Sequence, residues 1–301
     1  MNDHSSTVPE YTVTTMSDDP FLFFLHIPKN AGTTLRSILD CQYGRKSVLT
    51  YYNQPNHHLL DNLPYMLVDP KRDYRVLVGH YQFGLHKKLA KPSRYVTIVR
   101  HPVRRAISAY YENLANHPHK LTRPDGTIMP IDDMVLLEPG EYQNHQIKTL
   151  ANLPNGVEPD AQSFKMVLSN IADHFEMVGT SERFVESILL IGKRLGWRPC
   201  IWGRLNPGPP NPETSAHALD LLRETNVMDQ NLYEWSDAAL SSAIAAEGPA
   251  FTDALNELNQ ALAQRAEAGH SRLEAELVAE TEMPRVAAYW GSRTPAPIAQ
   301  R

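Results

Sequence analysis

Residues 26–35 combine a lysine, a glycine and two threonine hydroxyls in the order His-Ile-Pro-Lys-Asn-Ala-Gly-Thr-Thr-Leu. Gly32 permits a tight loop in which backbone N–H groups approach an oxyanion closely. A helix that begins at Thr33 and Thr34 would direct its free N–H groups and its dipole at the same point. Lys29 adds a mobile positive charge. The segment is typical of a loop that holds a phosphate group, although a plain strand-to-helix turn with an exposed lysine has the same residues.

A second set of residues could contact another phosphate. Arg100 ends an apolar stretch, and Ser108 follows at 108 − 100 = 8 positions. Arginine presents a planar fork that matches phosphate oxygens. Both side chains could turn back to one anion at the carboxyl edge of a parallel sheet, where α/β proteins bind ligands. Taken alone, the pattern is also that of a basic helix start with surface arginines.

Among the 13 histidines, His80 fits the role of a general base best. A base needs a pKa near the working pH and a place beside the reacting groups. His80 directly follows an apolar stretch and Gly79, which places it at the expected carboxyl edge. A histidine that only hydrogen-bonds its own loop is the alternative. His26 also ends an apolar run, and His101 could neighbour the second phosphate.

The first loop is not a Walker A motif, because Lys29 precedes Gly32. No acidic residue ends an apolar strand in the place of a Walker B ligand. Both departures argue against an ATP-dependent enzyme centred on magnesium. The histidines at 57–58, 117 and 119 lie in polar or proline-flanked stretches that are typical of solvated loops. We therefore expect no metal site.

The elements that position these residues follow from the apolar pattern. Continuous apolar runs predict buried parallel strands at residues 21–27, 74–78, 95–99 and 175–179. Helical spacing follows the first, third and fourth runs, with Thr33 or Thr34 as a helix cap and Pro102 in a first turn. We expect an α/β, P-loop-like fold of three layers: a mainly parallel central sheet flanked by helices, plus a helical C-terminal extension.

The pattern also predicts how the chain is divided. Residues 1–19 are expected to form a flexible leader, residues 20–248 the main domain, and residues 249–301 a helical extension. The last part of that extension, from Pro284, is interpreted as a frayed tail. Residues 115–160 are interpreted as an insertion made of loops, and the proline-rich residues 206–212 exclude a helix or a central strand.

Composition limits the possible partners and compartment. The 301 residues carry a net charge of 29 − 34 = −5, which excludes an overall field that attracts nucleic acid or anionic lipid. No apolar run approaches the roughly 20 residues needed to span a bilayer. The first 20 residues lack the pattern of a secretory signal, and two cysteines do not make a disulfide framework. These features predict a cytoplasmic, soluble protein.

Together, the two phosphate-binding segments resemble the family of sulfotransferases whose donor is 3′-phosphoadenosine 5′-phosphosulfate (PAPS). The first resembles the 5′-phosphosulfate loop, usually Pro-Lys-x-Gly-Gly-Thr-Ser-Leu, and the second resembles the 3′-phosphate motif. The chain is most similar to the branch of carbohydrate sulfotransferases that contains the heparan sulfate 2-O type, and we expect a soluble member of bacterial type. The similarity spans about residues 20–240. Besides the two phosphate-binding segments, the segments that resemble this branch are 78–84, 178–184, 195–197, 205–206 and 229–233.

The resemblance implies a role for each residue. Lys29 would stabilise the leaving phosphate, Arg100 and Ser108 would bind the 3′-phosphate, and His80 would be the base. The residues implied at the 5′-phosphosulfate are Lys29, Asn30, Ala31, Gly32, Thr33 and Thr34. The product would be 3′-phosphoadenosine 5′-phosphate (PAP), with no metal required.

Four departures from the family pattern stand out. Thr34 replaces the usual serine and keeps the hydroxyl. Ala31 occupies a position where glycine is usual, which is tolerable if its φ is negative. His101 replaces the usual Asp or Asn, and Arg104 stands where Glu is frequent. None of them removes a charge that the chemistry needs.

Two other functions fit parts of the pattern: a P-loop kinase of a small molecule, and a non-catalytic nucleotide-binding protein with its C-terminal helices as the interaction element. A second copy of the chain could bind through the same helices. The resemblance favours a sugar hydroxyl as acceptor, bound by loops at residues 51–72 and 112–160. Tyrosines that could stack on a sugar are Tyr51, Tyr52, Tyr65, Tyr110 and Tyr111.

Overall fold

The structure is a computed structural model of the 301-residue chain, and it describes residues 20–52, 58–69, 72–154, 156–203, 214–267 and 274–291. Four sequence predictions lie outside the described residues: the leader at 1–19, the proline-rich segment at 206–212, the similar segment at 205–206 and the tail beyond residue 291.

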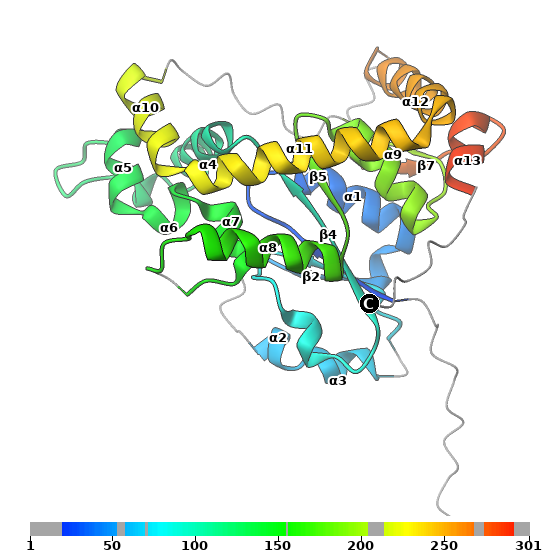
Figure 1. Ribbon diagram of the computed structural model, residues 1–301, viewed down its shortest axis with the longest axis horizontal. Helices are drawn as coiled ribbons and strands as arrows, with labels where there is room; N and C mark the ends of the chain where they lie inside the picture. The colour runs from blue at the N-terminus through cyan, green and yellow to red at the C-terminus, as the bar shows by residue number, and fades with distance from the viewer. Residues whose placement is uncertain are drawn as a thin grey trace, which may run out of the picture.

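A five-stranded sheet forms the centre of the molecule, in the order β2-β3-β1-β4-β5 (Figure 1). Its strands are β1 (Phe21–Leu25), β2 (Val48–Tyr51), β3 (Val76–Gly79), β4 (Ser93–Val99) and β5 (Phe175–Thr180). Leu25 lies opposite Gly79 of β3, and Phe24 lies opposite Val96 of β4, all in parallel register. The predicted α/β fold with a parallel sheet is confirmed. The edge strand β2 is not among the strands that the sequence predicts.

Side chains alternate between the two faces of the sheet. Leu22 and Phe24 face one core, which is covered by α1 (Gly32–Tyr43), α9 (Phe184–Leu195), α12 (Pro249–Glu267) and α13 (Pro284–Gly291). Phe21 and Phe23 face the other, which is covered by α7 (His145–Ala151), α8 (Ala161–His174) and α11 (Val227–Glu247). Helix α11 runs past β5 (Figure 1). Helices therefore cover both faces, as a buried parallel sheet requires.

The segment at 115–160 is not an insertion of loops. It contains α5 (Ile131–Leu137) and α6 (Pro139–Tyr142) as well as α7. Buried residues of α5 and Tyr142 pack against α4 (Pro102–Asn116) and α10 (Ala216–Thr225) in a third cluster. The prolines that suggested loops instead cap or begin short helices: Pro130 is the N-cap of α5, and Pro139 is the first residue of α6.

The prediction of a frayed tail from Pro284 is wrong for residues 284–291. These residues form α13, which buries Val286, Tyr289 and Trp290. The Trp290 Nε1–H donates to the Leu189 carbonyl of α9 at 2.7 Å. A Cβ at Gly192 would overlap the Trp290 indole, so the ring can pack against α9 only because position 192 has no side chain. The domain boundary at residue 248 stays a prediction, although α12 and α13 share a core with the sheet.

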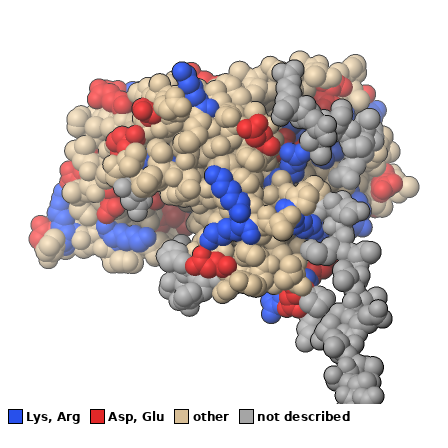
Figure 2. All heavy atoms as spheres, turned by 60° about the horizontal axis from the view of Figure 1, so that its bottom comes forward, with Lys and Arg blue, Asp and Glu red and all other residues tan. Residues whose placement is uncertain are grey.

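The remaining elements are short. A two-stranded antiparallel sheet joins β6 (Cys200–Ile201) to β7 (Glu276–Leu277). The other short helices are α2 (His58–Asp61), α3 (Leu63–Leu67), η1 (Arg45–Ser47), η2 (Leu85–Lys88) and η3 (Pro118–Lys120). Within the described residues, every helix is too short or too polar to cross a membrane. Basic and acidic side chains are interspersed over the face shown in Figure 2.

Candidate active site

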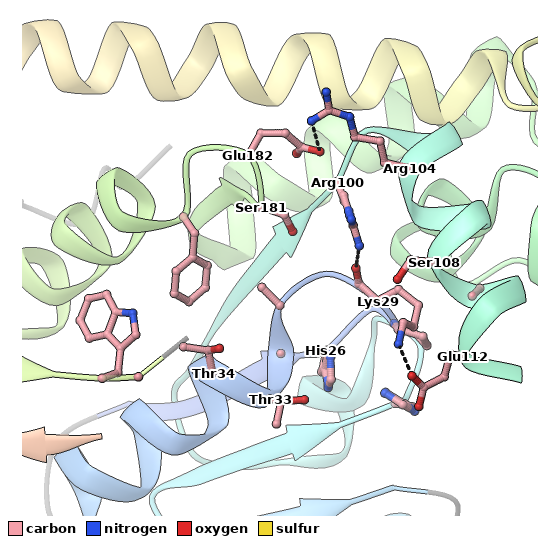
Figure 3. Close-up of a pocket in the computed structure, with 18 of the residues that line it drawn as sticks. His26, Lys29, Thr33, Thr34, Arg100, Arg104, Ser108, Glu112, Ser181 and Glu182 are labelled. Carbon is pink, nitrogen blue, oxygen red and sulfur yellow. Dashed lines mark hydrogen bonds and ion pairs between the residues drawn. The ribbon is translucent and has the colours of Figure 1, made fainter. Parts of the chain in front are cut away.

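A cavity of about 1040 Å³ opens at the edge of the sheet where β1, β3, β4 and β5 end. The loops that follow these four strands line it, together with helix α4. Figure 3 shows side chains from these separate segments converging on one space. All predicted site residues except Asn30 line this cavity: Lys29, Ala31, Gly32, Thr33, Thr34, His80, Arg100 and Ser108.

The loop before α1 has two residues in the left-handed region. The φ angle is 71° at Lys29 and 59° at Ala31, so the expectation of a negative φ at Ala31 is wrong. Ala31 is also the N-cap of α1, with no side-chain cap, in place of Thr33 or Thr34. The left-handed conformation costs a non-glycine residue about 1–2 kcal/mol. This conformation turns the chain sharply, so helix α1 begins at the cavity wall. The first N–H groups of α1 have no partner inside the helix and lie at this end.

Gly32 has no room for a side chain, because a Cβ there would overlap the imidazole of His26. The sequence left the direction of the His26 side chain open. The structure places this side chain in the cavity wall directly beside the loop. Close packing against an imidazole, rather than a positive φ, therefore makes glycine necessary at this position.

Asn30 points away from the cavity. Its side chain is fully buried and donates to the Ile98 carbonyl at 2.9 Å and to Gln146 Oε1 at 2.8 Å. The same Gln146 amide accepts from the Arg100 backbone N–H and donates to the Arg100 carbonyl, both at 2.8 Å. Gln146 thus joins the loop before α1 to the end of β4. The sequence analysis missed it because it lies in the segment interpreted as loops.

Arg100 supports the loop as well as lining the cavity. Its Nη1–H donates to the Lys29 carbonyl oxygen at 2.8 Å (Figure 3). Ser108 lies on α4, and its side chain also lines the cavity. The structure therefore brings the predicted pair of Arg100 and Ser108 to one cavity, and the Arg100 guanidinium is hydrogen-bonded to the loop before α1.

Lys29 forms an ion pair that the sequence did not predict. Its Nζ lies 2.8 Å from Glu112 Oε2 of α4 (Figure 3). The hydrogen bond from Lys29 lowers the pKa of the Glu112 carboxyl. Glu112 lies four positions after Ser108, so both occupy one face of α4. That helical spacing is the sequence signal that could have identified Glu112.

His80 and His26 line the cavity, and the Tyr52 ring packs against both of them. The two imidazole centres are 4.7 Å apart, and the Tyr52 ring is 4.8 Å from His80. His26 Nδ1 is 3.0 Å from the Tyr52 hydroxyl. Burial, reinforced by positive neighbours, lowers the pKa of His80 to about 4 and that of His26 to about 3. Both imidazoles are therefore neutral at pH 7 and able to accept a proton.

The Nε2 atom of His80 is buried and has no hydrogen-bond partner within the described part of the chain. An unpaired buried polar atom is costly in a folded protein. It is expected where a ligand supplies the missing partner.

His101 is separated from this group. Its backbone N–H is directed at the Glu182 carboxylate, at 3.3 Å, and its ring contacts Tyr233. It lines a second, smaller cavity of about 270 Å³ rather than the main one. Arg104 and Glu182 line the main cavity and lie 3.9 Å apart. Ser181 also lines the main cavity, and its buried hydroxyl has no hydrogen-bond partner among the described residues.

Apolar side chains also line the cavity. Phe184 and Trp202 are among them and meet edge to face, with ring centres 6.2 Å apart. Three residues of α12 line the cavity as well: Leu262, Arg265 and Ala266. The five tyrosines proposed for sugar stacking are not among the residues that line the cavity. Among the described residues, no cluster of three or more His, Cys, Asp or Glu side chains could hold a metal ion.

The fold and the cavity define an α/β protein with a cavity-lining loop between its first strand and first helix. A family model described as galactose-3-O-sulfotransferase matches residues 5–284, and the chain belongs to this family. No match is found among curated proteins. The predicted sulfotransferase family is confirmed, and membership makes the chain a transferase. The heparan sulfate 2-O branch and the bacterial type stay predictions.

Proposed function

We propose that the chain transfers a sulfonyl group from PAPS to a hydroxyl of a sugar, with galactose as the first acceptor to test. The family is described by transfer to galactose. The observation that carries the proposal is the single cavity that gathers the phosphate loop, Arg100, Ser108 and His80. These groups come from the loops after three different strands and from helix α4, and anion binding with proton removal explains why they share one space.

The donor would bind in the cavity, with its two phosphate groups held by two different sets of lining residues. The N-terminus of α1 and the hydroxyls of Thr33 and Thr34 suit the 5′-phosphate. Arg100 and Ser108 suit the 3′-phosphate, because a guanidinium fork pairs with phosphate oxygens. A bound 3′-phosphate distinguishes PAPS from ordinary adenine nucleotides.

The transfer requires one bond to form and one to break. The acceptor oxygen attacks sulfur, the bond from sulfur to the 5′-phosphate oxygen breaks, and PAP leaves with the electron pair. His80 would take the acceptor proton on Nε2, the atom that has no partner among the described residues. Lys29 would exchange its Glu112 partner for the oxygen on which charge develops.

The two rival functions remain testable. A kinase that depends on magnesium would need a carboxylate at a strand end, but β3 and β4 are followed by His80 and Arg100. The carboxylate that follows β5, Glu182, instead pairs with Arg104 and faces the His101 N–H. A non-catalytic binder would not need a neutral imidazole with an unsatisfied Nε2 in its cavity. Both observations support sulfonyl transfer.

Isothermal titration calorimetry with PAP, AMP and ATP plus magnesium tests the donor. We expect PAP to bind at least about tenfold more tightly than AMP, because a charge-assisted hydrogen bond contributes about 1.5–3 kcal/mol. A preference for ATP with magnesium would contradict the proposal and favour a kinase. Tight PAP binding without transfer from labelled PAPS to methyl galactoside or any other sugar would favour the passive binder.

A further inference from the structure

Among the described residues, three carboxylates line the main cavity: Glu112, Glu141 and Glu182. Glu112 pairs with Lys29. Glu182 lies 3.9 Å from Arg104. Both of these cations line the cavity themselves, so the two pairs belong to the charged surface that the donor would meet. Glu141 differs, because its cationic partner is not among the residues that line the cavity.

Glu141 is held by a buried arginine of α4. Arg105 Nη1 lies 3.5 Å from Glu141 Oε1, and Arg105 Nη2 donates to the Glu141 carbonyl oxygen. The Arg105 side chain is 0% exposed, whereas the Glu141 side chain is 36% exposed. Two contacts with one guanidinium therefore fix the backbone and the carboxylate of Glu141 together. A ligand in the cavity can reach this carboxylate but not the guanidinium.

The ion pair between Arg105 and Glu141 is a costly way to hold a short helix. Arg105 keeps Nε and Nη1 buried without a hydrogen-bond partner within the described part of the chain. Buried ion pairs seldom stabilise a protein more than apolar side chains of similar volume. Stability alone is thus a weak reason for the pair. A carboxylate that is oriented by a buried partner is preorganised to bind a ligand group.

Other polar groups on α4 are linked to Glu141. Ala109 and Asn113 lie four positions apart, so they share one face of this helix, and both line the cavity. Asn113 Nδ2 donates to the Tyr142 hydroxyl at 3.2 Å, and Tyr142 follows Glu141 directly. An amide, a carboxylate and a small methyl group therefore line the same cavity. This combination suits a neutral polyhydroxy compound better than a phosphate group, which a carboxylate repels.

Glu141 also lies near the proposed base. His80 and Glu141 both line the cavity. Burial is the main cause of the lowered pKa of His80, and the negative charge of Glu141 acts against this lowering, as expected for side chains that are close together. Hydroxyls on neighbouring carbons of a sugar ring lie side by side. A sugar with one hydroxyl at His80 therefore presents another hydroxyl to the surface around it.

We infer that Glu141 is a specificity-determining residue for the acceptor: its carboxylate accepts a hydrogen bond from a sugar hydroxyl next to the one that attacks sulfur. A hydrogen bond from a hydroxyl to a carboxylate is charge-assisted, so it contributes more than a bond between neutral groups. Arg105 is a positioning residue that orients the carboxylate. The inference rests on the proposed function, because it names the acceptor group that the same cavity recognises.

A series of deoxy sugars locates the recognised hydroxyl. Transfer from labelled PAPS is measured with methyl galactoside and with its 2-deoxy, 3-deoxy, 4-deoxy and 6-deoxy forms. The form that lacks the attacking hydroxyl should give no product. Of the forms that lack a neighbouring hydroxyl, we expect one to lose at least about tenfold in kcat/KM with the unmodified chain. Equal kcat/KM values for methyl galactoside and for the neighbouring deoxy forms would overturn the inference.

Glu141→Gln tests whether Glu141 makes this hydrogen bond. Gln keeps the shape of the side chain and loses its charge, so the penalty for the missing hydroxyl should fall to about threefold or less. The KM for methyl galactoside should rise about tenfold, while kcat and PAP affinity stay within about twofold. Glu138→Gln is the control, because Glu138 is exposed and does not line the cavity. This variant should keep the full penalty.

A second variant guards against a loss of folding, because Glu141→Gln leaves the buried Arg105 without its ion pair. Arg105→Met combined with Glu141→Leu removes both charges, and apolar replacement of a buried pair is often tolerated. Circular dichroism checks the fold, and the penalty should again be reduced. An unchanged penalty in either folded variant, or equal losses of PAP affinity and of acceptor kcat/KM, would overturn the inference. Failure of the unmodified chain to transfer from PAPS to any sugar would instead contradict the proposed function.

Discussion

At the scale of single residues, the site combines strained backbone, an unpaired buried nitrogen and an ion pair. Lys29 and Ala31 both adopt a left-handed backbone. His80 keeps a buried Nε2 that has no partner among the described residues, and Lys29 is paired with the Glu112 carboxylate. Such features concentrate where binding or catalysis uses them.

The conformation of Ala31 predicts a stabilising substitution. Glycine adopts a positive φ without steric cost, so Ala31→Gly should raise the free energy of unfolding by about 1 kcal/mol. Urea unfolding followed by circular dichroism measures this change. Ala109→Gly, within the right-handed helix α4, is the control and should destabilise the chain. A loss of stability in Ala31→Gly would show that the loop is not strained.

The lowered pKa of His80 predicts an unusual pH dependence. The value of kcat/KM for the donor reports groups of the free enzyme. It should stay level from pH 8 to pH 5 and fall only as His80 gains a proton, near its pKa of about 4. His80→Ala should lose about 10²–10⁴ in rate. His101→Ala should keep most of its rate, and the reverse result would assign the base to His101.

At the scale of elements, the site depends on contacts between segments far apart in the chain. Asn30 and Gln146 lie 116 positions apart, yet one hydrogen bond joins the loop before α1 to α7. Asp229 of α11 in turn accepts from the N–H groups of Gln146 and Ile147, at 3.0 and 2.7 Å. Helix α7 is therefore held at its first turn by a fully buried carboxylate.

Loss of the Gln146 amide should loosen this arrangement. Gln146→Leu leaves the backbone N–H and C=O of Arg100 without their buried partner, which costs about 1–3 kcal/mol for each unsatisfied group. We expect lower stability and weaker PAP binding together, measured by thermal unfolding and calorimetry. Gln230→Leu removes an exposed pair with Glu234 and should change neither. Full stability in Gln146→Leu would contradict the linking role.

The strands of the sheet could be predicted from the sequence because their residues are continuously apolar. Phe21, Val76 and Tyr95 lie in such runs and are fully buried. Strand β2 was missed because its four residues, at the sheet edge, are too few for a pattern. Gln146 and Glu112 could not be identified as site residues without the fold, because their partners are set by the packing of α4 and α7.

At the scale of the whole molecule, the C-terminal helices belong to the same core as the sheet. The Trp290 ring fits against Gly192 of α9, and residues of α12 line part of the main cavity. The sequence predicted a helical extension there but interpreted residues from Pro284 as a tail. The aromatic residues Tyr289 and Trp290 indicate a buried helix in this segment, and the sequence analysis did not use them. Assembly through these helices stays a prediction.

Buried histidines predict acid-sensitive folding. Burial lowers the pKa of His26 and His80 to about 3 and about 4, against about 6.5 in the unfolded chain. Between these values the unfolded chain binds more protons, so stability falls as the pH falls from about 6.5 to 5. Each histidine contributes up to about 1.4 kcal/mol per pH unit.

Urea unfolding at pH 7, 6 and 5 measures this slope. His80→Asn should show a shallower slope than the unmodified chain over the same pH range. An equal slope in both proteins would mean that His80 is not held neutral by the fold.

The central claim is that this cavity transfers a sulfonyl group with Lys29 at the leaving oxygen. Transfer of label from PAPS to methyl galactoside is measured with the unmodified chain, with Lys29→Ala, and with Lys87→Ala as an exposed control lysine. We expect transfer by the unmodified chain and by Lys87→Ala, and a loss of about 10²–10³ in kcat for Lys29→Ala with a smaller loss of PAP affinity. Equal losses of PAP affinity and of kcat/KM in Lys29→Ala, or transfer at the full rate, would contradict the account.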